Sequence, residues 1–598
     1  MTDEKKLPAW DLSDLYKGIN DPKIKSDLEQ YKQLNLGLAE KYKGKMAKLS
    51  AADFYEAVKT YEAASVAASK LGIFAYLNMI TQMSNKEAMA FYQDTNETMT
   101  EYGKPAIFFT LEINALPEDK FQALLQDSQV AYYAPWLKRV RMFKPYELSE
   151  DIEALLADKA LTSSAAWVRL YDETASKLKY VVDGKEYNDA EISKLLQDKD
   201  PLVREKAGKE LNRVNKENGE LFTFIYNMIV KDGAIEDEKR GFKSPIASRN
   251  LSNRVEDEVV DTLAETVRSK YKDIAERFYK LKAKWLGKEK IQYWDRNAPL
   301  PFSDDNMYSW QESVDLVLKA YGEFSPKLQE VAKDFFTHNW IDVPPRQGKR
   351  SGAFAMPLPS DLHPYLLLNF VGKQNDVLTL AHELGHGCHM QLSIKEGDLN
   401  DDTPLTLAEV ASVFAEMLTF QSILRSLKDD KAKLCLIASK VNDMINTSLR
   451  QIAFHFFEKK IHAERKKGEL SQERISEIWL DVMRESLGQY VIVDDDSKYI
   501  WPIVSHFYHS PFYVYAYSFA DCLVNSLYQV YREGTVSDFP DKYLQMLSQT
   551  GVKKYDELLQ PFGLDAHNPH FWLKGLGLIE EYISELELLD EKTCIMGA

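Results

Sequence analysis

Apolar residues recur at spacings of three and four along most of the chain, and charged residues fill the positions between them. The spacing is clear in DPKIKSDLEQYKQLNLGLAEKYKGK and AADFYEAVKTYEAASVAASKLGIFAYLNMI, and it returns in DPLVREKAGKELNRVNKEN. Ser50 stands immediately before the second segment, where a helix N-cap is expected. Because this spacing places apolar residues on one face of a helix, the sequence predicts a mainly α protein.

Two regions depart from the helical pattern. The segment KLKYVVDGKEYN carries Asp183-Gly184 between two β-prone runs, which predicts a hairpin. Region 340–375 is rich in Pro and Gly, and its runs SGAFAMPL and PYLLLNFVG predict adjacent strands of a small sheet. The helical segment KQNDVLTLAHELGHGCHMQL follows directly, with Asn375 or Asp376 as the expected N-cap.

The pattern suggests one division of the chain. Near residue 200, DKDPLVRE opens a fresh helix, so we expect an N-terminal helical domain at 1–200 and a second domain at 201–598. Nothing there resembles a flexible linker, so the two parts are expected to pack closely. The sequence does not determine the oligomeric state.

Composition narrows the classes of function. Lysine and arginine total 75 and aspartate and glutamate total 92, so the net charge is −17, which argues against nucleic acid as the ligand. The four cysteines form no CxxC pair, which fits a reducing compartment. The beginning of the chain has no apolar run typical of a signal peptide, and no long uncharged apolar run predicts a membrane span. We therefore expect a cytoplasmic protein with no membrane partner.

Candidate metal-binding and catalytic residues lie close together in the segment VLTLAHELGHGCHMQL. His382 and His386 are four residues apart, so on a helix they share a face and can bind one Zn²⁺ through nitrogen. Glu383 lies close enough to reach a water at the metal, which is the physical content of the H-E-x-x-H pattern. The pattern also arises by chance, but Gly385 and Gly387 are costly inside a helix and indicate that something packs closely there.

A catalytic zinc ion needs a third protein ligand and one open position. The segment TPLTLAEVASVFAEMLTFQSILRSL predicts a single helix over 403–427, and Glu409 lies on its apolar face. We interpret Glu409 as the third ligand. Glu416, two turns later, is either an acceptor for the other N–H of a ligand histidine or a solvated charge. His389 shares the face of the ligand pair and is either a contact near the site or a core histidine.

These motifs resemble peptidase family M3, the thimet oligopeptidase-like zinc metallopeptidases, and within it the oligoendopeptidase F branch. The resemblance covers about residues 200–590 and rests on four segments: KRSGAFAMPLPSDLHPYLLLNFVG, TLAHELGHGCH, TLAEVASVFAEML and HFYHSPFYVYAYSFADCLV. The candidate third ligand stands in Glu409-Val410-Ala411-Ser412, which fits the F branch better than the Glu-Ala-Pro-Ser of the thimet branch.

The resemblance implies a large helical two-part body around a deep substrate channel, with a small β-sheet beside the H-E-x-x-H helix. It implies one Zn²⁺ per chain, bound by His382, His386 and Glu409, with Glu383 as general base. It also implies substrate-contacting His and Tyr residues in the late aromatic segment. The best matches there are His506, Tyr508 and Tyr515, with His509 and Tyr513 as further candidates. The choice among the tyrosines stays open, since aromatic residues also fill cores.

The predicted function is hydrolysis of internal bonds in short unstructured peptides by a zinc-activated water, with Glu383 as base and a Tyr or His donor for the oxyanion. The edge of SGAFAMPL is a candidate for pairing with the substrate backbone. Three alternatives remain: a zinc carboxypeptidase of similar helical build, for which Arg350 or Arg450 is available, a non-catalytic peptide-binding protein, and a structural zinc module. Cys388 is expected to face away from the ligand pair, and thiol oxidants to inhibit modestly at most.

Overall fold

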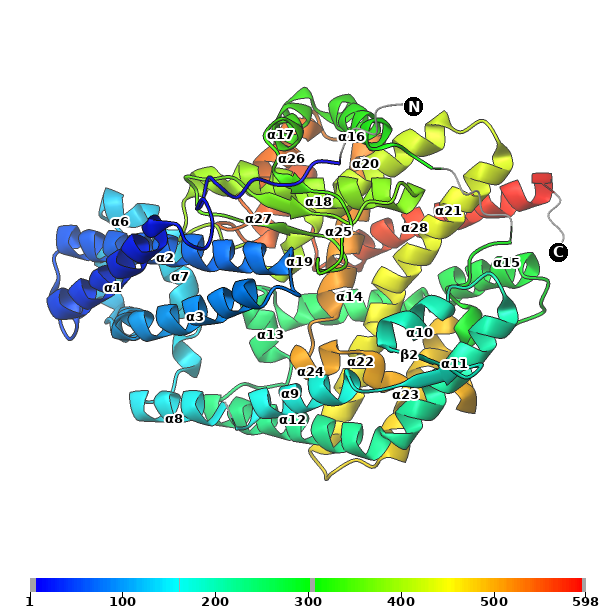
Figure 1. The fold of residues 1–598 in the computed structure, drawn as a ribbon, viewed down its shortest axis with the longest axis horizontal. Coiled ribbons are helices and arrows are strands. Elements are labelled where there is room, and N and C mark those ends of the chain that lie inside the picture. The colour runs from blue at the N-terminus through cyan, green and yellow to red at the C-terminus, as the bar shows by residue number, and fades with distance from the viewer. Residues whose placement is uncertain (1–6, 161, 302–306, 594–598) are drawn as a thin grey trace. The chain divides into compact units, whose positions relative to one another are not determined.

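The computed structural model describes residues 7–160, 162–301 and 307–593 (Figure 1). Helices dominate and the strands are short, which confirms the predicted mainly α class. The chain forms two compact units that are interleaved along the sequence. Each unit contains residues from both sides of position 200, so these units are a different division of the chain from the predicted one. The domains predicted at 1–200 and 201–598 stay a prediction.

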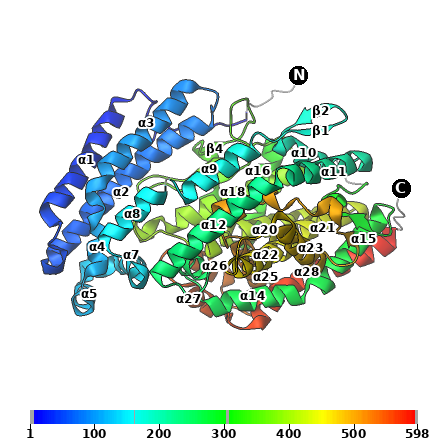
Figure 2. The ribbon, with the colours of Figure 1, turned by 90° about the horizontal axis from the view of Figure 1, so that it is seen from below.

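Unit 1 consists of Met1–Pro145, Asp305–Ile423 and Ser537–Pro561. Its helices are α1 (Pro22–Tyr42), α2 (Ala51–Ile80), α3 (Lys86–Gly103), α4 (Phe108–Ala115), α5 (Glu118–Leu124), α6 (Ser128–Tyr132), α7 (Ala134–Met142), α16 (Trp310–Phe324), α17 (Pro326–Thr337), α18 (Gln374–Ser393), α19 (Leu405–Ala408), most of α20 (Val410–Ser426), α26 (Phe539–Leu547) and α27 (Tyr555–Leu559). Helices α1, α2 and α3, coloured blue, run side by side in both views (Figures 1 and 2). As predicted, Ser50 caps α2, because its side chain accepts a hydrogen bond from the N–H of Asp53.

A three-stranded sheet lies in unit 1. Its order is β4 (Ile341–Asp342), β6 (Tyr365–Leu367), β5 (Phe354–Met356). The central strand β6 is buried, pairs in parallel with β4 and pairs antiparallel with β5, with Ala355 opposite Leu366. Both β5 and β6 pack against α18, which confirms a small sheet beside the H-E-x-x-H helix.

The start of α18 differs from the prediction. The helix begins at Gln374, after Lys373, rather than after Asn375 or Asp376. Asp376 lies at the third helical position, and its carboxylate accepts the N–H groups of Val371 and Lys373 at 3.0 and 2.9 Å. A carboxylate three residues inside a helix can reach back to the entering backbone, so an acidic residue near a helix start does not by itself identify the cap.

Unit 2 consists of Tyr146–Asp304, Leu424–Val536 and Phe562–Ala598. Its elements are α8 (Glu150–Ala160), α9 (Ser164–Ala175), β1 (Tyr180–Val182), β2 (Lys185–Tyr187), α10 (Asp189–Leu195), α11 (Pro201–Glu217), α12 (Gly219–Arg240), α13 (Ala247–Ser252), α14 (Asp257–Ser269), α15 (Arg277–Trp285), β3 (Ile291–Gln292), α21 (Asp430–Met444), α22 (Arg450–Arg465), α23 (Gln472–Leu487), β7 (Val491–Ile492), α24 (His506–His509), α25 (Tyr515–Glu533) and α28 (Pro569–Thr593). Helix α25 is buried along most of its length and packs on α28. Strands β3 and β7 pair in parallel.

The predicted hairpin is confirmed. Strands β1 and β2 pair antiparallel, with Tyr180 opposite Tyr187. Asp183 and Gly184 both have positive φ, at 51° and 79°, which is the backbone of a type I′ turn. The predicted helix start near residue 200 is also confirmed, because Asp200 caps α11 through the N–H of Leu202.

Two helical stretches are long and apolar enough to cross a membrane when only length and composition are counted: Ala51–Ile80 and Leu405–Ser426. Within their most apolar parts, 33% of the first and 72% of the second is buried inside the protein. Core helices pass the same test, so these two helices are weak evidence for a membrane span.

Candidate functional site

Two glycines allow α18 to approach its neighbours closely. A Cβ on Gly385 would lie 2.8 Å from the carbonyl oxygen of Ala411 and 2.8 Å from the Cβ of Ala415, both on α20. A Cβ on Gly387 would lie 2.7 Å from the ring of Phe335 on α17. These distances are too short for any larger residue, so the close packing expected from the two glycines is confirmed.

The close approach of α18 and α20 brings three candidate metal ligands together. Nε2 of His382 and Nε2 of His386 lie 3.2 and 3.3 Å from Oε2 of Glu409. One ligand atom from each residue lies within 4.8 Å of the other two. Ligand atoms about 2.0–2.1 Å from a tetrahedral ion are separated by about 3.3–3.4 Å, so the donor atoms and their spacing fit zinc.

The helical hydrogen bonding is interrupted at Glu409, whose backbone keeps right-handed helical angles (φ −85°, ψ −2°). Helix α19 ends at Ala408 and α20 begins at Val410, so the helix predicted over 403–427 is present over Leu405–Ser426 with one interruption. The hydroxyl of buried Ser412 donates to Oε2 of Glu409 at 2.8 Å and orients that carboxylate. Sequence reasoning missed this contact, although a serine three residues after a buried carboxylate was a visible signal.

Glu416 lies on the other side of the His382 ring. Its Oε2 is 3.2 Å from Nδ1 of His382, while Nε2 of the same ring points to Glu409. A proton on Nδ1 shared with Glu416 leaves the lone pair of Nε2 available to a metal. Of the two interpretations of Glu416, the geometry fits the acceptor and not the solvated charge.

Burial and neighbouring charges shift the pKa values of His382 and Glu409 in opposite directions. Burial opposes a charge on His382, but Glu409 and Glu416 outweigh it and raise the pKa of the ring to about 10. Burial likewise opposes a charge on Glu409, and hydrogen bonds from His382 and His386 outweigh it and lower the pKa of that carboxyl. Negative charge gathered around two imidazoles is the environment that a divalent cation requires.

Glu383 is 7% exposed and follows His382 directly on α18. Burial raises the pKa of its carboxyl above the usual range, and the two neighbouring histidines oppose the rise. A carboxylate with a raised pKa is a better proton acceptor than an ordinary glutamate. The position and basicity of Glu383 therefore suit a general base.

Two other residues of α18 belong to the core. His389 is buried, its Nε2 lies 2.7 Å from the hydroxyl of Thr550, and burial lowers the pKa of the ring to about 4. Of the two interpretations of His389, the structure fits the core histidine. Cys388 is 1% exposed and burial raises the pKa of its thiol, so the reactive thiolate is disfavoured.

The late aromatic segment lies in unit 2, and two of its selected tyrosines are buried. The ring of Tyr508 stacks on Tyr171 at 3.8 Å, and the side chain is 1% exposed. Tyr515 is fully buried and its hydroxyl accepts a hydrogen bond from Asn253 at 2.8 Å. The structure therefore argues against Tyr508 and Tyr515 as groups that touch substrate, because both rings are used in packing.

The partly exposed members of the segment form a different set. The rings of His506 and Tyr513 stack at 5.3 Å, and the hydroxyl of Tyr517 lies 3.3 Å from Nε2 of His506. Tyr517 stood in the same aromatic run of the sequence but was not selected there. His509 is exposed and pairs instead with Asp172 at 2.9 Å.

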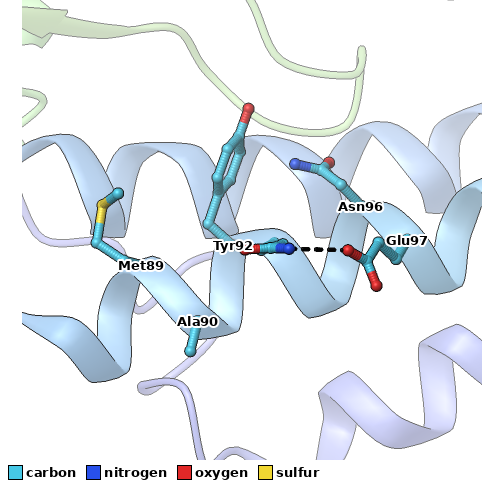
Figure 3. Close-up of a pocket in the computed structure, with 6 residues that line it drawn as sticks. Met89, Ala90, Tyr92, Asn96 and Glu97 are labelled. Atoms are coloured by element: carbon cyan, nitrogen blue, oxygen red, sulfur yellow. Dashed lines mark hydrogen bonds between the residues drawn. The ribbon is translucent and has the colours of Figure 1, made fainter. Parts of the chain in front are cut away.

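One hollow on unit 1 lacks catalytic groups. A hollow of about 520 Å³ is lined by six residues of α3, among them Tyr92, Asn96 and Glu97 (Figure 3). Gln93 donates to Glu97 at 2.9 Å across one helical turn. No histidine lines this hollow, so the candidate active site is the group of residues on α18, α19 and α20.

Comparison with known proteins points in the same direction. The model of peptidase family M3 matches residues 194–578, and the Oligopeptidase F model matches residues 112–180. The chain is 26% identical to oligopeptidase PepF of Bacillus subtilis (97% of this chain, 87% of the relative) and 26% identical to an oligoendopeptidase F homolog of Lactococcus lactis (98% and 97%). A crystal structure from Chlamydophila abortus superposes with a TM-score of 0.84 at 23% identity and covers 97% of this chain and 98% of its own.

Proposed function

The chain belongs to peptidase family M3 and is a metallopeptidase, and on that premise we propose that it is a zinc-dependent oligoendopeptidase that cleaves internal bonds of short, unstructured peptides. The observation that carries the proposal is the convergence of His382, His386 and Glu409 next to Glu383. These residues supply three ligands and a base while leaving one coordination position for substrate chemistry. A structural zinc site would instead use four protein ligands.

His382, His386 and Glu409 would hold the zinc ion, which would supply Lewis acidity toward the scissile carbonyl and a water near neutral pH. Glu383 accepts the proton of the attacking water at its carboxylate and then delivers it to the nitrogen of the leaving amine. Its raised pKa favours both steps, since the group must hold the proton between them. Glu416 keeps the His382 ring in one orientation throughout.

On the family resemblance alone, the oxyanion donor is proposed to come from the late aromatic segment of unit 2, and His506 and Tyr517 are its candidates. Both are partly exposed, whereas the hydroxyls of Tyr508 and Tyr515 lie inside unit 2. A phenol hydroxyl or an imidazole N–H directed at a developing oxyanion is typically worth about 3–4 kcal/mol. Tyr513 stacks on His506 and fixes the plane of that ring.

Substrate binding is proposed to use the edge of β5. This strand ends the sheet order β4–β6–β5, so one side of its backbone carries no strand partner among the described residues. An extended peptide can add to such an edge through backbone hydrogen bonds, which gives affinity with little dependence on side chains. The deep channel that the family implies stays a prediction, as does exclusion of folded proteins by it.

The deciding experiment uses an internally quenched nonapeptide with both ends blocked. We expect wild type to cleave it internally, and Glu383→Gln to retain about one zinc per chain while its rate falls about 10²–10⁴-fold. Glu330→Gln, an exposed position on α17, is the matched control and should behave as wild type. Cleavage that needs a free C-terminus would favour the carboxypeptidase alternative, and zinc binding with no cleavage of any peptide would refute the proposal.

A further inference from the structure

Unit 2 contains a buried group of basic and phenolic side chains that the proposed reaction does not use. It comprises Tyr279 and Lys282 on α15, Tyr293 and Arg296 in the turn after β3, and Arg450 at the start of α22, and we call it the Arg296 cluster. Tyr279 is fully buried, Lys282 is 3% exposed and Arg296 is 5% exposed. Three cationic side chains therefore lie close together in the interior of one unit.

The protein partners of these cations are neutral. Nζ of Lys282 donates to the carbonyl oxygen of Arg296 at 2.5 Å and to Oδ1 of Asn442 at 3.3 Å. The guanidinium of Arg296 donates to Oδ1 of Asn446. The side chain of Arg450 lies over the ring of Phe454, with 4.9 Å between the guanidinium carbon and the ring centre. None of these contacts neutralises positive charge.

Four polar atoms of the cluster make no hydrogen bond of good geometry among the described residues, although Tyr279 faces Arg296 and Tyr293 faces Arg450. They are Nε of Arg296, Nε of Arg450 and the hydroxyls of Tyr279 and Tyr293, and each of these atoms is buried. A buried donor without an acceptor is strongly unfavourable, and a guanidinium cannot escape the cost by losing its proton. Four such donors in one place indicate a missing acceptor.

The nearest buried carboxylate is already used. Asp295 is fully buried, but its oxygens pair with Arg204 at 3.0 Å and with Lys288 at 2.5 Å. Asp443 of α21 acts on Lys282 from an exposed position and lies on the solvent side. The excess positive charge of Arg296 and Arg450 therefore has no protein counter-charge that the structure shows.

The pKa values of Arg450 and Lys282 agree with this picture. Burial lowers the pKa of Arg450 to about 10, and the neighbouring charge of Arg296 lowers it further in the same direction. Burial lowers the pKa of Lys282 to about 7, again with Arg296 acting in the same direction. An anion between these groups would reverse both effects.

The cluster also adjoins a space of suitable size. A cavity of about 40 Å³ is lined by Tyr293 and Arg296 of the cluster and by Gly208 and Leu211 of α11. Asp496 also lines it, and its carboxylate pairs with Lys209 at 3.9 Å. A single water needs about 10–15 Å³ of such space, so the cavity accepts a small ion and excludes a bulky oxyanion or a nucleotide. We infer that the Arg296 cluster binds one small monovalent anion of the chloride class.

The first test measures thermal unfolding of the full chain as chloride replaces gluconate at constant ionic strength. We expect the Tm of wild type to rise with chloride and to saturate, because a ligand that binds only the folded state stabilises it by mass action. Arg450→Gln should lose this dependence. Arg213→Gln removes an exposed arginine of α11 in the same unit and should keep it.

A second test does not depend on the folding of a variant. Crystals of wild type grown in bromide should show an anomalous peak in the cavity beside Tyr293 and Arg296. Tyr293→Phe, which preserves volume, should weaken the halide dependence of the Tm several-fold. A Tm that ignores chloride at fixed ionic strength, or ordered water at the bromide position, overturns the inference. Neither outcome bears on peptide hydrolysis, so the inference stands apart from the proposed function.

Discussion

The carboxylate of Glu416 lies 3.2 Å from Nδ1 of His382, and it reaches that atom from α20 while the histidine belongs to α18. The same ring presents Nε2 to Glu409 at 3.2 Å. His382 is therefore held between two carboxylates, one at each nitrogen. Because the ring cannot turn without losing one of them, its lone pair stays directed at the ligand cluster.

Removing that contact should weaken metal binding more than it disturbs the fold. Glu416→Ala is expected to lower zinc affinity about 10–100-fold, since the ring loses its orienting acceptor. Glu416→Gln keeps an acceptor oxygen and should lose less. Competition with a chromogenic chelator measures both, with the exposed Glu330→Ala as control. A Glu416→Ala protein that binds zinc as tightly as wild type would show that the contact has no role in metal binding.

Gly385 fixes the distance between α18 and α20. Gly385→Ala places a methyl group 2.8 Å from atoms of Ala411, Ser412 and Ala415, so α20 must move and carry Glu416 with it. We expect a stability loss of about 1–3 kcal/mol together with weaker zinc binding. Urea unfolding and chelator competition measure the two effects.

The matched control for this substitution is Gly37→Ala on α1 in the same unit. No atom lies within 4 Å of a Cβ at Gly37, and the residue is exposed inside a helix. That substitution should stabilise the protein by about 0.4–1 kcal/mol, because the alanine lowers the conformational entropy of the unfolded chain. Equal behaviour of the two alanine variants would mean that the close approach at Gly385 is unimportant.

Local geometry explains why the core of the site was predictable from the sequence. His382, Glu383 and His386 lie on one helix, where spacing alone sets which side chains share a face. The two glycines revealed close packing through their cost in a helix. The partner of that packing, the interruption at Glu409 and the contact from Ser412 depend on how two helices meet, and spacing along one helix carries no such information.

In the aromatic segment, sequence periodicity does not predict which tyrosine rings are buried. Helix α24 ends at His509, and Phe512 has a φ of 58°, in the left-handed region. A helical or strand period cannot be carried across such a residue, so the spacing of tyrosines did not reveal which rings point inward. The Arg296 cluster was hidden for a similar reason, since Arg450 is far from Arg296 in sequence and joins it only in the folded unit.

The exposed and buried tyrosines can be separated by kinetics. Tyr517→Phe removes a hydroxyl proposed to donate to the oxyanion, so kcat should fall about 10²–10³-fold with little change in KM. Tyr508→Phe removes a buried hydroxyl that has no partner among the described residues, so kcat should hardly change and the Tm should stay equal or rise. A large loss in Tyr508→Phe with none in Tyr517→Phe would reverse the assignment.

Glu458 of α22 offers a test based on pH. The side chain is fully buried, its Oε1 accepts the N–H of Phe512 at 2.8 Å, and burial raises the pKa of the carboxyl to about 8. The folded protein then holds a proton on Glu458 that the unfolded chain releases near its ordinary pKa of about 4.3. The stabilisation linked to that proton is complete below the unfolded pKa and is lost as pH rises toward 8, by at most about 1.4 kcal/mol per pH unit. Glu458→Gln keeps the acceptor oxygen and cannot titrate. The unfolding free energy of the variant minus that of wild type should therefore increase from pH 5 to pH 8 and stay constant above pH 8. Urea unfolding of both proteins across this range measures the difference, and a difference that stays constant with pH would show that Glu458 carries no raised pKa.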